Sequence, residues 1–136
     1  MSLFQHIKRY KLSVLCIVAI WTVCLVKPPS TGLDSITNID KIVHTGLYFS
    51  LCTIIWWEYL HSHSKLAWGR IVAFACIAPI LMSACIEFAQ GYATTYRSMD
   101  WEDVVANSVG VLISLPSGYF VLRNLIWNKN DSRNSK

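Results

Sequence analysis

The chain has 136 residues, of which 54% are hydrophobic and 15% are charged, and its formal net charge is +4 at pH 7. Soluble domains carry about 25% charged residues, and the mean hydropathy of this chain is positive, at +0.40. The composition therefore argues against a soluble globular domain and favours an integral membrane protein.

Apolar stretches of membrane length recur along the chain. A spanning helix needs roughly 17–25 mainly apolar residues. Stretches that reach or approach this length lie at residues 10–26, 42–60, 67–89 and 104–122. They predict an all-α integral membrane four-helix bundle over residues 1–127. Residues 128–136 form a polar tail, which we expect to lack regular structure.

The first apolar stretch resembles the core of a signal peptide, because Lys8, Arg9 and Lys11 lie at its start. It is followed by Lys27 and two prolines rather than by a small-residue cleavage pattern. We therefore predict that this segment is a retained first helix.

The positions of the basic residues predict the orientation. If the N-terminus is cytoplasmic, nine of the twelve Lys and Arg residues lie inside, and Lys27, Lys41 and Arg97 lie outside. Cytoplasmic loops of membrane proteins carry an excess of Lys and Arg, so both termini are predicted to be cytoplasmic and the protein to be multi-pass in the plasma membrane. Anionic lipid headgroups suit the basic ends, so membrane lipids are expected partners and no nucleic acid is needed.

Cysteines and prolines within the apolar stretches have structural interpretations. The five cysteines form no C-x-x-C motif, and we expect small buried hydrophobic residues without disulfides or a cysteine metal site. Pro79 and Pro116 should kink their helices and free a carbonyl, which Ser83, Ser114, Ser117 or a neighbouring helix can satisfy.

The second and third stretches place polar residues near the predicted outer membrane boundary. Asp40, His44 and Tyr48 recur every four residues, which keeps them on one helix face. Glu87 and Gln90 are three residues apart near the outer end of the third stretch. Ionisable groups at membrane depth are costly, and they usually pair with one another or line a cavity.

The fourth stretch opens with a further polar face. Asp100, Asp103, Asn107 and Gly110 are spaced three, four and three residues apart, within an arc of roughly 80° at about 100° per residue. Gly110 would allow close helix contact. The three helices together predict an outward-facing polar pocket, whose candidate ligand-binding residues are Asp40, His44, Tyr48, Glu87, Gln90, Arg97, Asp100, Asp103 and Asn107.

Each of these residues also has a structural interpretation. Ser98 and Asp100 are suited to cap the fourth helix. His44 and Asn107 can serve as interhelical hydrogen-bonding groups. Glu87 and Asp103 can form structural ion pairs with Arg97.

The polar motifs resemble those of the VanZ-like membrane proteins over about residues 40 to 113. The motifs stand in the family's order as Asp40-Lys41-x-x-His44-x-x-x-Tyr48, Glu87-x-x-Gln90 and Arg97-Ser98-x-Asp100-x-x-Asp103-x-x-x-Asn107-x-x-Gly110. The sequence departs from the family in having Ser114 in place of a further small residue, and Thr95-Tyr96-Arg97 in place of Pro-Gly-Arg. The resemblance implies a small multi-spanning protein, whose namesake reduces susceptibility to the glycopeptide antibiotic teicoplanin.

Binding of an envelope lipid is the first functional hypothesis. The pocket would hold the polar headgroup of a cell-wall lipid intermediate or a phospholipid, with Arg97 gripping phosphate or carboxylate through its planar guanidinium. The mixture of one arginine with acids and amides at headgroup depth favours this hypothesis.

Two other hypotheses stand beside it. In an intramembrane enzyme acting on a lipid-linked substrate, Glu87, Asp100 or Asp103 with His44 would hold a divalent metal, or a buried carboxyl would act as general base. No complete catalytic motif is present, so we assign no catalytic residue, metal or cofactor. In a structural or assembly protein, the polar residues would only lock the helices together.

Overall fold

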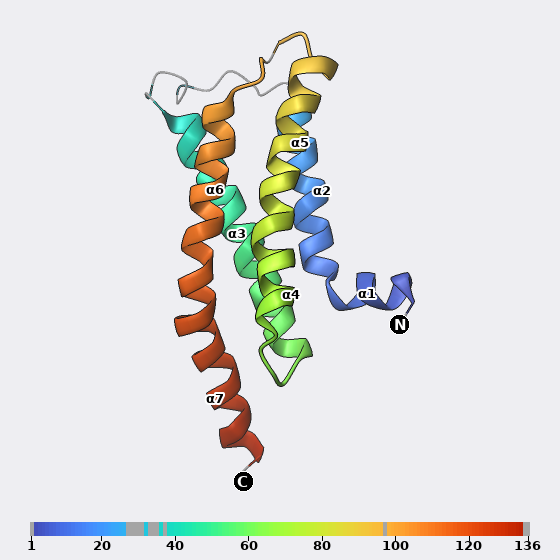
Figure 1. Ribbon diagram of the computed structural model, residues 1–136, viewed down its shortest axis with the longest axis vertical. Coiled ribbons are helices and arrows are strands. Elements are labelled where there is room, and N and C mark those ends of the chain that lie inside the picture. Colours follow the sequence, from blue (N-terminus) through green and yellow to red (C-terminus); the bar gives the residue numbers. More distant parts are fainter. Residues whose placement is uncertain (1, 27–31, 33–35, 37, 97, 135–136) are drawn as a thin grey trace.

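The computed structural model describes residues 2–26, 32, 36, 38–96 and 98–134. All regular structure in these residues is helical, which confirms the all-α prediction for this part of the chain. In chain order the helical segments are α1 (Leu3–Arg9), α2 (Lys11–Leu25), α3 (Ile39–Ser62), α4 (Trp68–Val72), η2 (Ala73–Ile77), α5 (Ala78–Ala93), α6 (Trp101–Pro116), η3 (Ser117–Leu122) and α7 (Arg123–Asn134) (Figure 1).

In the part of the chain that the structure describes, two continuous helical runs are long and apolar enough to cross a membrane. They are Trp68–Ala93, which joins α4, η2 and α5, and Trp101–Ser132, which joins α6, η3 and most of α7. α2 is apolar but has only 15 residues, and α3 has 24 residues but carries a polar face. Spans at α2 and α3, and with them the four-helix bundle, therefore stay predictions.

Helix α3 lies at the centre of the fold and packs against α2, η2, α6 and η3 (Figure 1). Its most extensive contact is with α6, where Gly110 permits a close approach. A Cβ atom at Gly110 would lie 2.3 Å from the carbonyl oxygen of Thr45. The Thr45 hydroxyl donates a hydrogen bond to the Ala106 carbonyl at 3.0 Å. The close helix contact expected at Gly110 is confirmed.

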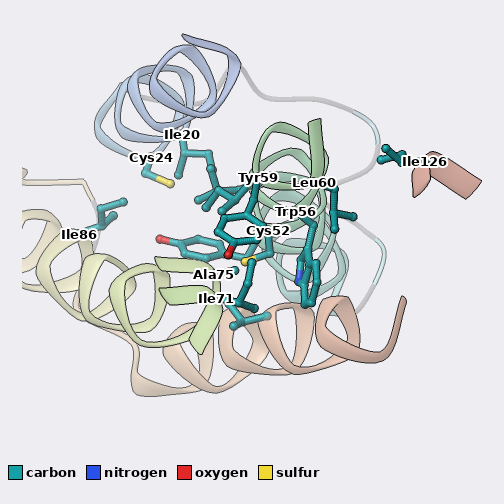
Figure 2. Close-up of a cluster of buried hydrophobic side chains, with 14 residues drawn as sticks. Ile20, Cys24, Cys52, Trp56, Tyr59, Leu60, Ile71, Ala75, Ile86 and Ile126 are labelled. Carbon is teal, nitrogen blue, oxygen red and sulfur yellow. The ribbon is translucent and has the colours of Figure 1, made fainter. Parts of the chain in front are cut away.

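The apolar core lies around the second half of α3 (Figure 2). Trp56 and Cys52 are fully buried there, and Gly118 of η3 lies against the indole ring of Trp56. Cys24 is also buried, as expected, but Cys85 is exposed on α5, so the expectation of burial was wrong for this cysteine.

π-Helical turns accompany the two prolines within the apolar stretches, Pro79 and Pro116. η2 ends two residues before Pro79, and η3 begins directly after Pro116. Wider turns of this kind let a helix continue past a residue that cannot donate a backbone hydrogen bond. Ser117 donates to the Ile113 carbonyl at 3.1 Å and Ser114 to the Val111 carbonyl at 2.6 Å.

Both ends of the chain contain helix that the apolar pattern did not predict. The basic N-terminal arm forms α1, which leads away from α2 (Figure 1). The expectation that the tail lacks regular structure was wrong, because α7 continues to Asn134. Ile126 is buried, and the indole N–H of Trp127 donates to the Leu60 carbonyl at 3.2 Å, so α7 is anchored to α3 where it begins.

Candidate functional site

A group of polar side chains lies where the start of α3, the end of α5 and the start of α6 meet, at the end of the molecule remote from both termini (Figure 1). We call this group the polar cluster, and its described members are Asp40, His44, Tyr48, Ser83, Glu87, Gln90, Asp100, Asp103 and Asn107. Arg97, the remaining predicted site residue, lies outside the described residues.

At the outer end of the cluster, the imidazole ring of His44 lies between two carboxylates. Nε2 of His44 lies 3.7 Å from Oδ1 of Asp40 and 3.7 Å from Oδ2 of Asp103. His44 and Asp103 are buried, whereas the side chain of Asp40 is 58% exposed. One ligand atom from each of these residues lies within 4.8 Å of the other two. Asp40 therefore connects a buried histidine–carboxylate pair to the surface.

A second level joins α6 to α5. The amide of Asn107 donates to the Ser83 hydroxyl at 2.7 Å, and both residues are fully buried. Tyr48 of α3 is also buried, and its hydroxyl makes no hydrogen bond within the geometric limits among the described residues. Asn107 thus does link helices, as its structural interpretation predicted.

Unused hydrogen-bonding atoms remain in this part of the cluster. Within the described residues, Nδ1 of His44, the Tyr48 hydroxyl and Oδ1 of Asn107 are buried without a hydrogen-bond partner. Buried polar atoms in proteins are almost always paired. The protein side chains alone therefore leave hydrogen-bonding capacity unused on both α3 and α6.

Glu87 holds the segment that leads into α6. Its Oε2 atom accepts the backbone N–H of Asp100 at 3.0 Å. Asp100 in turn caps α6, because its Oδ1 accepts the backbone N–H of Glu102 at 2.9 Å. The capping interpretation is confirmed for Asp100, which occupies the N-cap position itself, and not for Ser98.

Gln90 faces α2. Its amide donates to the Cys24 carbonyl at 2.8 Å, near the end of α2, and the Tyr96 hydroxyl donates to the neighbouring Leu25 carbonyl. These bonds satisfy terminal carbonyls of α2, which have no partner within the helix. In this arrangement Gln90 attaches α2 to α5.

Among the described residues of the cluster, acidic side chains predominate. Asp40, Glu87, Asp100 and Asp103 supply carboxylates, and the one lysine at its edge, Lys41, pairs with Glu102 at 2.6 Å. Within the described residues, the cluster suits a cation or hydrogen-bond donors better than a bare anion.

Sequence reasoning missed a buried carboxylate at the other end of α3. Glu58 accepts the backbone N–H groups of Leu12 and Ser13 at 2.8 and 3.0 Å, and the Ser13 hydroxyl at 2.6 Å. It therefore caps α2 from a neighbouring helix, where a negative charge also complements the helix dipole. An acid inside the second apolar stretch is the signal that could have identified it, because such a group needs partners.

Comparison with known proteins gives a family match. Residues 1–123 match the family described as VanZ/LLP1. No curated protein and no solved structure matches the chain.

Proposed function

This chain belongs to the VanZ/LLP1 family, and we propose that its polar cluster binds the polar headgroup of an envelope lipid or of a lipid-linked cell-wall precursor. The headgroup enters beside Asp40, the exposed member of the cluster. His44, Tyr48 and Asn107 provide the buried hydrogen-bonding atoms.

The main support for this proposal is a set of buried polar atoms that have no hydrogen-bond partner among the described residues. An unpaired polar group costs several kcal/mol in an environment without water. His44, Tyr48 and Asn107 each keep such an atom, on two helices that face each other. A ligand with hydroxyl or amine groups would pair with these atoms when it binds.

The acidic residues of the cluster indicate which chemical groups a ligand would carry. Sugar hydroxyls and ammonium groups donate hydrogen bonds to carboxylates, whereas a bare phosphate would be repelled by Asp40 and Asp103. A phosphate in the ligand is assigned to Arg97, whose guanidinium suits bidentate contacts. Lipid-linked precursors and phospholipid headgroups combine these chemical groups.

Replacing Tyr48 with Phe tests this proposal without disturbing the fold. The substitution removes one hydroxyl that makes no hydrogen bond of normal geometry. Lipids that co-purify with the protein would be extracted and quantified by mass spectrometry. We expect Tyr48→Phe to lower at least fivefold the amount of the lipid species that the cluster retains, at unchanged thermal stability, while lipid held elsewhere on the protein is unchanged.

Ser108→Ala provides the matched control, because Ser108 donates only to the Val104 carbonyl of its own helix. It should leave the bound lipid unchanged. Equal lipid in wild type, control and Tyr48→Phe would contradict the proposal and leave the cluster as a lock between helices.

A link to glycopeptide susceptibility follows from the family's namesake and belongs to the proposal. A protein that binds a lipid-linked cell-wall precursor would change how much of that precursor teicoplanin can reach. We expect expression of the wild-type protein to raise the teicoplanin concentration needed to stop growth, and Tyr48→Phe to lose this effect. Equal protection by both proteins would separate the phenotype from the cluster.

The Asp40–His44–Asp103 triad favours a second candidate, a divalent cation site in an intramembrane enzyme. Imidazole suits zinc and carboxylate oxygens suit harder cations. Two ligand atoms that each lie about 2.0–2.2 Å from a metal are at most about 4 Å apart. The candidate ligand atoms of the triad lie within 4.8 Å of one another. Small rotamer changes would therefore bring them to bonding distance of one ion. Metal analysis should find one ion per chain, lost in His44→Ala. A metal-free wild type that turns over no lipid would reject this candidate.

A further inference from the structure

An apolar groove lies toward the end of the molecule that holds both termini, away from the polar cluster. It has a volume of about 830 Å³, within the roughly 300–1,000 Å³ typical of ligand pockets. It opens between α2 and the segment running from α4 to α5, and α3 forms its floor. Its apolar lining includes Ile17, Leu51, Ile55, Ile71, Phe74 and Met82.

The charged residues at the groove are all basic. Arg9 at the end of α1 and Arg70 in α4 line it, together with His6 and His63. Both arginines are exposed, and neither forms an ion pair with a described residue. No Asp or Glu is among the described residues that line it.

The carboxylate of Glu58, beside the start of α2, already has hydrogen-bond partners. Glu58 is buried and accepts hydrogen bonds from Leu12 and Ser13, where α2 begins. Among the described residues, its oxygens accept hydrogen bonds from the helix terminus, and it forms no ion pair with Arg9 or Arg70. Among the described residues, the groove combines an apolar interior with two guanidinium groups that form no ion pair.

The groove is also lined by aromatic residues, which lie between its apolar part and its basic part. Tyr10 and Tyr59 line the groove between its aliphatic residues and its arginines. Tyr59 is held there, because its hydroxyl donates to the Lys65 carbonyl and accepts the Ala67 N–H. Tyrosine is typical of the membrane–water interface, so we expect the arginines to stand at headgroup depth.

We propose that this groove is a binding site for an anionic phospholipid of the leaflet next to the termini, which is the cytoplasmic leaflet in the predicted orientation. One acyl chain lies along Ile17, Ile55 and Phe74, and the phosphate lies between Arg9 and Arg70. Anionic lipids are enriched in that leaflet and attract basic residues near its surface. The site is separate from the polar cluster and does not depend on the function proposed for it.

Selectivity for the headgroup is the property to measure. Lipid tails are as apolar as the groove itself, so chain burial alone does not favour one lipid over another. Native mass spectrometry of the full chain in detergent would be titrated with phosphatidylglycerol and with phosphatidylcholine of identical acyl chains. We expect phosphatidylglycerol to bind at least tenfold more tightly.

Two matched double variants separate the groove from general surface charge. Arg9→Gln with Arg70→Gln removes the groove arginines, and Lys8→Gln with Lys129→Gln removes the same charge from exposed positions that do not line the groove. Phosphatidylglycerol affinity should fall at least tenfold in the arginine variant and less than twofold in the lysine variant. Ala78→Trp, which fills the groove without a change in charge, should also abolish binding.

Several outcomes would overturn the proposal. Equal loss in both double variants would reduce the effect to bulk surface charge. Equal affinity for the two lipids would show a groove without headgroup recognition. A dimer that Ala78→Trp dissociates would assign the groove to a second copy of the chain. Each variant's thermal unfolding, compared with wild type, separates these results from misfolding.

Discussion

Two individual buried residues, both glutamates, accept hydrogen bonds from backbone N–H groups. Glu87 accepts the N–H of Asp100 before α6, and Glu58 accepts two N–H groups at the start of α2. Hydrogen bonds to ionised acceptors are about twice as strong as neutral ones. Both acids therefore connect segments distant in sequence, and Glu58 does so across 45 residues or more.

Glu58→Gln should destabilise the protein clearly. Glutamine keeps one acceptor oxygen but places an NH₂ group against N–H donors, so at least one hydrogen bond to a charged group is lost. Such bonds contribute about 1.5–3 kcal/mol each, and we expect a loss of about 2 kcal/mol or more. The free energy of unfolding from an SDS titration in mixed micelles measures it.

Glu102→Gln is the matched control for that substitution. Glu102 pairs with Lys41, but its side chain is 71% exposed, and exposed pairs contribute little. It should unfold at nearly the same SDS fraction as wild type. A loss for Glu102→Gln equal to that for Glu58→Gln would contradict the role assigned to the α2 cap.

The residues of the cluster could be predicted from spacing, but their partners could not. Four-residue spacing on α3 places Asp40, His44 and Tyr48 on one face, because helix geometry is local. The contact of Gln90 with Cys24 depends on how α2 packs against α5, which no local pattern contains. The same holds for the pairing of Lys41 with Glu102.

The close packing of helix α3 on helix α6 sets the distances within the polar cluster. His44 and Asp103 face each other across this contact, and Gly110 lies two helical turns below Asp103. Its missing side chain lets the two backbones approach each other. The distance between the histidine and the carboxylate therefore depends on a glycine outside the cluster.

Gly110→Ala should separate α3 from α6. The added methyl group would overlap the Thr45 carbonyl oxygen, and overpacking of this kind costs about 1–3 kcal/mol. We expect lower stability in the SDS titration and weaker ligand retention, because His44 and Asp103 move apart.

Gly46→Ala serves as the control on the opposing helix. A methyl group added at Gly46 would meet no described atom within 4 Å, and alanine favours a helix over glycine by up to about 1 kcal/mol. This variant should be as stable as wild type or more so. Equal destabilisation by both substitutions would show that glycine flexibility, and not close contact, matters at position 110.

The approximate position of one long apolar helix followed from its hydrophobicity, although its C-terminal boundary did not. The third apolar stretch, predicted at 67–89, corresponds to the run Trp68–Ala93. The polar residues of α7 carry no such signal, since their helix is continued from α6 through η3 and anchored by Trp127. For this reason the polar composition of residues 128–136 predicted an unstructured tail, whereas α7 continues through most of it.

α1 and α7 both lie in the lower half of Figure 1, and the polar cluster lies toward the opposite end of the molecule. This arrangement agrees with a chain whose termini share one side of the membrane. The basic residues of α1 and α7 then face the cytoplasm by the positive-inside rule. The orientation stays a prediction, because the membrane is inferred from length and composition.

Reporter fusions test the orientation. A fluorescent protein fused after Lys136 should fluoresce and an alkaline phosphatase fused there should be inactive, because both reporters would lie in the cytoplasm. A cysteine at Glu102 should react with a membrane-impermeant thiol reagent in intact cells or spheroplasts. Active phosphatase at the C-terminus would reverse the predicted topology and move the cluster to the cytoplasmic face.

Native mass spectrometry of wild type beside Asp103→Asn and Glu102→Gln tests most directly whether the polar cluster is a binding site. These adjacent substitutions each remove one carboxylate, from a buried position facing His44 and from an exposed one. A binding site at the cluster predicts a bound mass in wild type and Glu102→Gln that is lost in Asp103→Asn, with the mass separating a lipid from a metal ion. Lipid held in the groove would persist in all three proteins. Identical spectra from all three folded proteins would contradict a binding role for the cluster.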